Sequence, residues 1–403
     1  MKVLGALGRP LPAALAAAVL AGTAAPAAAQ EPPRVRAPAA TVVDAGSGEV
    51  LYERDAGTPR AIASATKLMT ALLTLERVDG ATVFTAVPYR ASPVESKIGL
   101  RTGERITVSD LLTALLLESA NDAAVTLAER VGSSRRKFVR AMNAKAVELG
   151  LEGTHYANPV GFDNPRNRST AGDLAQLAVR LLRDPRFART VNLERAELRL
   201  GTRLRTVVNR NRLIARVPFV DGVKTGHTRS AGYVLVGSAS GRGAQVVSVV
   251  LGEPSEAARD ADTLALLRWG LDRFRRVRVV RARTAVAVVR AKGSDARSGL
   301  VSRRPLAVTL RRGERPTKRV RAPREVEGPL PRGSRVGTVE VLHRGRVIAR
   351  RPLVTAQALP APGGPGALTW LGGAAMLAAL GLGALRLRAV RMRRQKADAG
   401  PAA

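Results

Sequence analysis

The hydrophobic pattern between residues 41 and 274 changes its period three times along the chain. From Thr41 to Tyr52 two short apolar runs flank Ala45-Gly46-Ser47-Gly48, which predicts two strands joined by a flexible turn. From Ser64 to Leu182 apolar residues recur with helical spacing, and after Leu204 the strand-like spacing returns before a last helical segment. This order predicts an α/β domain with a mostly antiparallel sheet and a helical block inserted into it.

Capping and helix-breaking residues divide these regions into separate elements. Helices are expected at 64–75, 111–117, 122–131, 134–149, 170–182 and 253–274, the second capped by Thr107 or Ser109 and the last with Pro254 in its first turn. Strands are expected at 204–208, 233–240 and 245–251. The resulting α/β domain is predicted to span residues 38–275.

Residues 276–355 consist of short β-branched segments broken by Gly, Pro and Arg, which predicts a small all-β domain. Between Arg273 and Arg351 the chain carries 24 Lys or Arg and 5 Asp or Glu, a surplus of 19 within its net charge of +34. Either this surface is simply solvated, or it lies against anionic lipid headgroups or wall polymers. Nucleic acid is not expected as a partner, because only 3% of residues are aromatic and the basic residues are scattered.

Both ends of the chain carry an apolar segment whose flanking residues are typical of a targeting signal or a membrane anchor. Lys2 and Arg9 precede an apolar run from Leu11 to Ala25, and Ala27-Ala28-Ala29 supplies the small residues of a signal-peptidase site, so residues 1–29 are predicted to be a signal peptide. A Pro/Gly-rich linker at 356–365 precedes the uncharged segment 366–385. Its 20 positions reach about 30 Å as a helix, the thickness of a bilayer core.

Arginines crowd the tail at 386–403, which the positive-inside rule places in the cytoplasm. We therefore expect a cell-membrane protein with one transmembrane helix and an extracytoplasmic catalytic domain. Gly and Ala make the segment at 366–385 weakly hydrophobic, so a peripheral helix is the alternative.

The composition excludes several kinds of chemistry. Without cysteine the chain has no disulfide, thiolate nucleophile or iron-sulfur cluster, and His155, His227 and His343 form no helical H-x-x-x-H pair that would hold a metal. P-loop, Rossmann and G-x-S-x-G motifs are also missing from the sequence. We expect no metal and no cofactor, and chemistry that depends on Ser, Thr, Lys, Asn and carboxylates.

Ser64-Ala65-Thr66-Lys67 places a hydroxyl and an amine on one face of a predicted helix. A neutral lysine can remove the serine proton, provided that burial or a second cation lowers its pKa from about 10.4. Ser134-Arg135-Arg136-Lys137 has the same spacing, but it lies among arginines at a predicted helix start, where a capping role is the better interpretation. The Ser64 copy lies in an apolar context and is the candidate nucleophile.

Two further motifs accompany it: Ser119-Ala120-Asn121, the only S-x-N, and Lys224-Thr225-Gly226, the only K-T-G. Together with Asn158-Pro159-Val160-Gly161-Phe162-Asp163, they resemble the D-alanyl-D-alanine carboxypeptidases, the low-molecular-mass penicillin-binding proteins. The resemblance covers about Ala40 to Phe274. It implies a penicillin-binding-protein/β-lactamase-like domain, followed here by the small β domain and the transmembrane helix.

The resemblance also implies residue roles. Ser64 would attack the carbonyl between two D-alanines at the end of a peptidoglycan stem peptide, with Lys67 as general base and Ser119 as proton relay. Asn121 would bind the substrate amide, and Lys224 and Thr225 would hold the terminal carboxylate. Gly226 and His227 would also belong to the substrate-binding residues, and the backbone N–H groups of Ser64 and His227 would form the oxyanion hole. β-Lactams would acylate Ser64 as inhibitors.

Three other functions share these motifs. A β-lactamase would need a deacylating glutamate that the sequence does not place, and it gains little from a membrane anchor. A D,D-endopeptidase acting on cross-links differs only in the pocket beyond the leaving residue. A non-catalytic β-lactam-sensing or wall-binding module would have no need of an activated nucleophile. Glu118 and Asp122 are interpreted as a solvated pair and a helix cap.

Overall fold

The computed structural model of the 403-residue chain describes residues 31–198 and 204–361. The predicted signal peptide, transmembrane segment and basic tail lie outside these residues. Within the described ranges, no helix has both the length and the apolar character needed to span a bilayer.

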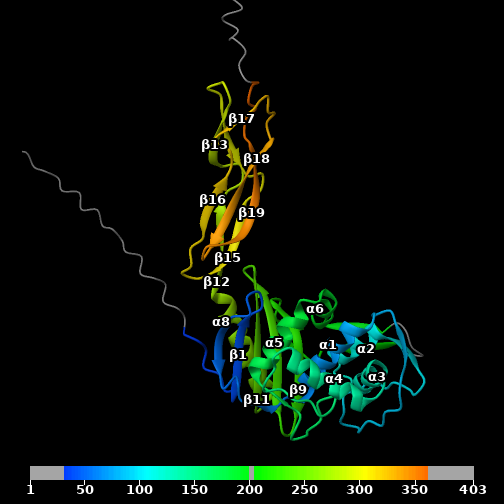
Figure 1. The fold of residues 1–403 in the computed structure, drawn as a ribbon. Coiled ribbons are helices and arrows are strands. Elements are labelled where there is room, and N and C mark those ends of the chain that lie inside the picture. The colour runs from blue at the N-terminus through cyan, green and yellow to red at the C-terminus, as the bar shows by residue number, and fades with distance from the viewer. Residues whose placement is uncertain (1–30, 199–203, 362–403) are drawn as a thin grey trace, which may run out of the picture.

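A five-stranded sheet forms the centre of the larger domain (Figure 1). Its order is β2 (Val50–Arg54), β1 (Ala39–Asp44), β11 (Ala244–Glu253), β10 (Gly232–Gly241) and β9 (Val220–Thr228), and every neighbouring pair is antiparallel. The predicted hairpin and antiparallel sheet are confirmed. Since β9 is last in the order, one of its edges is not paired within this sheet.

Successive residues of the central strands pack on opposite faces of the sheet. Val42 and Val246 contribute to a core with α8 (Glu256–Asp272), whereas Val43 and Val247 contribute to the larger core under the helical block. With both faces covered, the strands are almost entirely apolar. The helical block contains η1 (Ala63–Thr66), α1 (Lys67–Arg77), α2 (Val108–Leu116), α3 (Asn121–Gly132), α4 (Arg135–Glu148), α5 (Ala171–Leu182) and α6 (Pro185–Val191).

Side-chain caps fix where several helices begin. Thr107 Oγ1 accepts the Asp110 N–H at 3.0 Å before α2, and Thr170 Oγ1 accepts the Asp173 N–H at 2.9 Å before α5. Ser255 caps α8, so Pro254 lies before that helix and not in its first turn as predicted. Two short helices were not predicted, α6 and α7 (Leu213–Arg216). Strand β8 (Arg205–Val208) was predicted, but five other short strands were not: β3 (Arg60–Ala61), β4 (Val83–Thr85), β5 (Arg105–Thr107), β6 (Arg168–Ser169) and β7 (Arg195–Leu198).

The second domain is built from strands alone within its described residues, around a separate apolar core. β12 (Phe274–Val280) pairs with β15 (Leu306–Arg311). A six-stranded sheet contains β16 (Thr317–Arg321), β18 (Arg335–His343), β19 (Arg346–Thr355), β14 (Arg297–Val301), β13 (Ala285–Ala291) and β17 (Glu325–Val326), in that order. Leu359 is buried in the same core, so the chain is packed in this domain as far as that residue.

The two domains are joined directly, because α8 ends at Asp272 and β12 begins at Phe274. Phe274 is itself buried in the core under α8. Across the junction Arg311 forms an ion pair with Glu49 at 2.8 Å, and Arg312 Nε donates to the Asp272 carbonyl at 2.6 Å. Figure 1 shows the β domain projecting from the sheet end of the larger domain.

Candidate active site

Ser64 and Lys67 lie where a 3-10 turn becomes helix α1. Most of α1 is buried, from Lys67 to Thr74, so the lysine at its first position is enclosed as well. Lys67 Nζ donates a hydrogen bond to Ser64 Oγ at 3.0 Å. The spacing predicted from the sequence therefore produces direct contact between the base and the nucleophile.

Two glycines allow other segments to approach this turn closely. A Cβ on Gly161, where φ is +94°, would lie 2.0 Å from the Ala63 carbonyl oxygen. A Cβ on Gly226 would lie 3.0 Å from the Ser64 backbone nitrogen. Neither position has space for a side chain, so the 158–163 loop and β9 hold the nucleophile from two sides.

Lys67 is completely buried, and its Nζ also donates to the Val160 carbonyl at 2.5 Å. Burial lowers the pKa of Lys67 well below its usual value, and the nearby Lys224 lowers it further, against an opposing effect of Glu95. The amine is consequently neutral at a far lower pH than an exposed lysine, as a general base requires. The sequence analysis gave Val160 no role, because the function of its carbonyl depends on a contact 93 residues away.

Lys224, Thr225 and Gly226 lie on β9, the edge strand packed beside η1. Burial, together with the smaller effect of the Arg210 cation, lowers the pKa of Lys224 to about 7. Lys224 Nζ donates to the Thr225 carbonyl at 3.0 Å. The His227 ring is exposed and stacks on Tyr233, with ring centroids 4.0 Å apart, which leaves the side chain outside the pocket chemistry.

Ser119 and Asn121 lie between α2 and α3. Ser119 has φ +62°, a left-handed conformation that costs energy in a residue with a Cβ. Its Oγ is buried and has no hydrogen-bond partner among the described residues. A strained backbone that carries an unsatisfied hydroxyl is typical of a functional position rather than of a stabilising one.

Glu95 is a site residue that the sequence analysis did not identify. Its carboxylate accepts from Asn121 Nδ2 at 3.1 Å, from the Ser92 N–H at 2.9 Å and from the Tyr89 hydroxyl. With the Asn121 amide nitrogen engaged in this way, its amide oxygen is free to accept from a substrate N–H. No local pattern marks Glu95, because all that distinguishes it is contact with a residue 26 positions away.

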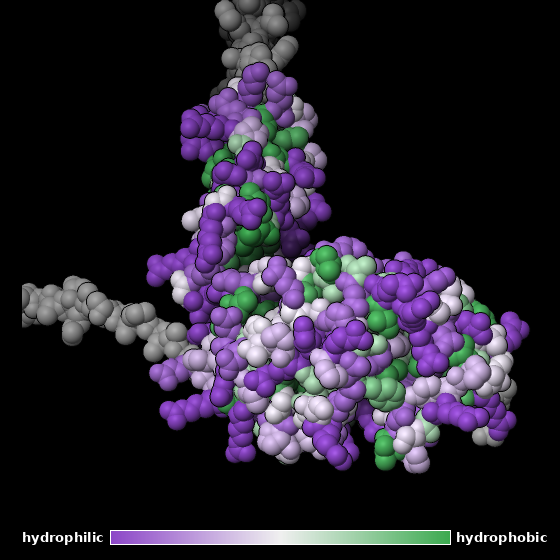
Figure 2. Space-filling model, turned by 60° about the horizontal axis from the view of Figure 1, so that its bottom comes forward, coloured by the Kyte–Doolittle hydropathy of each residue, from purple (hydrophilic) through white to green (hydrophobic). Residues whose placement is uncertain are grey.

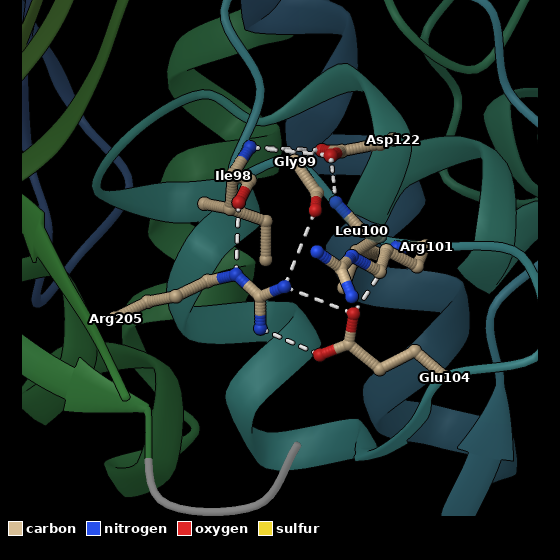
Figure 3. Close-up of polar contacts among 7 residues, drawn as sticks. All are labelled: Ile98, Gly99, Leu100, Arg101, Glu104, Asp122 and Arg205. Carbon is tan, nitrogen blue, oxygen red and sulfur yellow. Dashed lines mark hydrogen bonds and ion pairs between the residues drawn. The ribbon is translucent and has the colours of Figure 1, made fainter. Parts of the chain in front are cut away.

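The loop that carries Glu95, residues 86–104, is anchored at its far end (Figure 3). Asp122 accepts from the Ile98 and Leu100 N–H groups at 3.2 and 3.0 Å. Arg205 donates to the Ile98 carbonyl at 2.9 Å and to both carboxylate oxygens of Glu104 at 2.6 and 2.9 Å. Asp122 was interpreted as a helix cap, but it instead holds this wall of the pocket.

The second S-x-x-K motif behaves as the capping interpretation predicts, because Ser134 Oγ accepts the Lys137 N–H at 3.2 Å at the start of α4. Glu118 does form a pair, with Arg210. Thus Lys67 contacts Ser64 directly, and its pKa is lowered by its burial and by the charge of Lys224 and raised by that of Glu95. Glu95 in turn accepts a hydrogen bond from Asn121. No hydrogen bond among the described residues links Ser119 to Lys67.

Comparisons with known proteins identify the family of the chain. Residues 26–255 match the family model described as D-alanyl-D-alanine carboxypeptidase. The chain is 31% identical over 327 residues to D-alanyl-D-alanine carboxypeptidase DacF of Bacillus subtilis, covering 79% of this chain and 84% of that one. It is 32% identical over 276 residues to the D-alanyl-D-alanine carboxypeptidase of Streptomyces sp. strain K15, covering 64% and 94%.

Solved structures show the same likeness. Penicillin binding protein 5 from Haemophilus influenzae has a TM-score of 0.57 at 26% identity, with 82% of this chain and 99% of that one covered. The Streptomyces K15 DD-transpeptidase has a TM-score of 0.57 at 30% identity, with 60% and 98% covered. On the match of its sheet-and-helix domain and on these relatives, the chain belongs to the D-alanyl-D-alanine carboxypeptidase family of penicillin-binding serine peptidases.

Proposed function

We propose that Ser64 is the nucleophile with which this D-alanyl-D-alanine carboxypeptidase removes the terminal D-alanine from peptidoglycan stem peptides. The observation that carries the proposal is the 3.0 Å hydrogen bond between Ser64 Oγ and the Nζ of Lys67, a buried lysine whose pKa is lowered by that burial and by Lys224. A charged amine could donate to the hydroxyl but could not take its proton; a neutral one can.

In the proposed acylation step, Lys67 takes the proton of Ser64 as the serine oxygen attacks the carbonyl carbon between the two D-alanines. The oxyanion is stabilised by the backbone N–H groups of Ser64 in η1 and His227 in β9, two segments that approach closely at Gly226. Ser119 passes a proton to the departing amine, and D-alanine leaves. Water then attacks the acyl-enzyme and regenerates the Ser64 hydroxyl.

Substrate binding is assigned to groups on both sides of the nucleophile. Lys224 and Thr225 hold the terminal carboxylate from β9, and Asn121 accepts the substrate amide N–H with the orientation that Glu95 imposes. The unpaired edge of β9 offers a place for an extended peptide. A β-lactam carries a carboxylate and a strained amide in a similar arrangement, so it acylates Ser64 in the same pocket.

We also propose that residues 1–29 direct export, and that residues 366–385 cross the cell membrane with the tail in the cytoplasm. Support comes from the charge pattern alone: an uncharged segment of 20 residues followed by an arginine-rich tail. Protease treatment of intact cells tests this topology, since it should remove the catalytic domain and leave the tail protected.

The test of the mechanism is D-alanine release from a peptide ending in D-Ala-D-Ala, together with labelling by a fluorescent penicillin. Wild-type protein should show both, and Ser64→Ala should show neither. Ser134→Ala, which removes the hydroxyl of the second S-x-x-K motif, is the matched control and should keep both activities. D-Alanine release by Ser64→Ala would refute the proposed nucleophile.

The same protein should be given a cross-linked peptidoglycan dimer, because the endopeptidase alternative differs only in the group that leaves. Faster cleavage of the dimer than of the D-Ala-D-Ala peptide would replace the carboxypeptidase assignment with the endopeptidase one. Penicillin labelling without hydrolysis of either substrate would identify a sensing module.

A further inference from the structure

Three connected hollows run across the β domain, and arginines line all of them. The first, of about 440 Å³, and the second, of about 380 Å³, share Arg303, Gly333 and Val354. The second and the third, of about 450 Å³, share Arg335, Arg351 and Pro352. Neighbouring hollows therefore adjoin one another through these shared residues, and we call the three together the arginine groove.

Six arginines of this groove form no ion pair with any carboxylate in the described ranges: Arg283, Arg303, Arg304, Arg332, Arg335 and Arg351. The only acidic side chain that lines the groove is Glu340, in the third hollow. Its carboxylate is already paired with Arg319, Arg321 and Arg350, at 2.8, 3.0 and 3.2 Å. The first two hollows therefore carry positive charge that no neighbouring side chain neutralises.

Elsewhere in this domain acids and bases do pair. Glu314 contacts Arg344 at 2.9 Å and His343 at 3.3 Å, and Glu327 contacts Lys292 at 3.1 Å. Glu314, Glu327 and Glu340 are thus paired outside the first two hollows, whereas the arginines that line those two hollows have no carboxylate beside them. Figure 2 shows hydrophilic side chains crowding the margins of the projecting domain. A general excess of charge would not by itself leave one groove without acids.

The shape and lining of the groove indicate what kind of anion fits it. Guanidinium groups bind phosphate with two hydrogen bonds at a time, and successive hollows allow successive phosphates to be bound. A flexible polymer chain can enter hollows that adjoin one another, whereas the flat surface of a bilayer can contact only side chains that protrude. The groove is lined by no aromatic residue, so it offers no surface on which nucleic-acid bases could stack.

We propose that the arginine groove binds a linear polymer of phosphodiester-linked polyol units, of the kind that accompanies peptidoglycan in cell walls. The choice of a wall polymer rests on the proposed wall function, while the phosphate chemistry rests on the groove alone. Binding there keeps the enzyme on the wall between encounters of its active site with stem peptides.

The test measures binding of fluorescently labelled poly(glycerol phosphate) to the full chain in nonionic detergent, by anisotropy at several salt concentrations. The groove variant is Arg304→Gln/Arg332→Gln/Arg335→Gln, three exposed arginines whose side chains form no hydrogen bond or ion pair within the described residues. The control variant removes the same charge from exposed arginines outside the groove, as Arg276→Gln/Arg278→Gln/Arg346→Gln. Unchanged far-UV circular dichroism and thermal unfolding show that the β domain of both variants folds, and unchanged D-alanine release shows the same for the catalytic domain.

The groove variant should bind about tenfold more weakly. Because each phosphate contact with a flexible chain contributes about 0.7 to the slope of log K against log salt, its slope should fall by about 2. The control variant should change the affinity less than about threefold. Equal losses in both variants would overturn the proposal, because they would mean diffuse attraction by net charge.

Two further binding measurements compare the polymer with other anions. Tighter binding of a single-stranded oligonucleotide with the same number of phosphates would overturn the proposal, as would groove-dependent binding to phosphatidylglycerol vesicles without polymer binding. Failure of the wild type to release D-alanine would refute the proposed function and leave the polymer result standing.

Discussion

Arg205→Met tests whether the buried ion pair with Glu104 holds one wall of the active site. The Glu104 side chain is fully buried and that of Arg205 is 11% exposed, so solvent screens their attraction little. Removal of one partner from a buried pair costs about 3–5 kcal/mol, because the other charge stays buried with less compensation; Glu104 keeps the hydrogen bond from the Arg101 N–H at 3.1 Å. Arg205 also donates to the Ile98 and Gly99 carbonyls, so we expect a loss of about 4 kcal/mol.

The loss is measured by urea unfolding followed through Trp269, which lies on α8 of the catalytic domain. The control is Arg242→Met, which breaks the exposed pair with Asp272 and should cost less than about 1 kcal/mol. A double variant, Arg205→Met/Glu104→Leu, should recover most of the loss because no charge stays buried. Penicillin acylation of Arg205→Met should slow as the Glu95 loop moves. Equal costs for Arg205→Met and Arg242→Met would refute the reasoning.

Three other substitutions test separate parts of the site. Lys224 has a pKa of about 7, so its cation disappears as the pH rises through that value and kcat/KM for D-alanine release should fall; Lys224→Arg should abolish this fall in a pH profile. Gly161→Ala places a Cβ 2.0 Å from a carbonyl oxygen and should lower stability by more than about 2 kcal/mol with loss of penicillin labelling, whereas Gly57→Ala, with open space around it, should change stability by less than about 1 kcal/mol. Ser119→Gly relieves a left-handed backbone and removes an unsatisfied hydroxyl, so thermal unfolding should show a gain of about 1 kcal/mol while hydrolysis is lost; lower stability would contradict this account.

Much of the catalytic domain was predictable because its signals are local. The turn after Asp44, the Thr107 and Thr170 caps and the apolar period of each helix are all properties of neighbouring residues. In the β domain the strand pattern of β16 is hard to recognise in the sequence. For β16 the reason is that exposed Lys and Arg occupy most of its positions, so alternation of apolar residues is faint.

In the candidate site, too, the local relationships could be predicted from the sequence and the long-range contacts could not. Ser64 and Lys67 could be paired from the sequence because i and i+3 share a helix face, and the second motif at Ser134 could be set aside from its position at a helix start. The contact of Glu95 with Asn121 could not be found, because it depends on the path of a long loop. That path is fixed in turn by Arg205, more than a hundred residues further on.

The direct passage from α8 into β12 has a mechanical consequence. A flexible linker of several residues would let the catalytic domain move through a wide volume, and the distance between the two domains would vary with the conformation of the linker. Here only Arg273 separates helix from strand, Phe274 is packed in the catalytic core, and Arg311 and Arg312 brace the joint. The β domain is therefore fixed stiffly to the catalytic domain, and under the proposed membrane anchoring its length would set the distance from the membrane at which Ser64 meets its peptide.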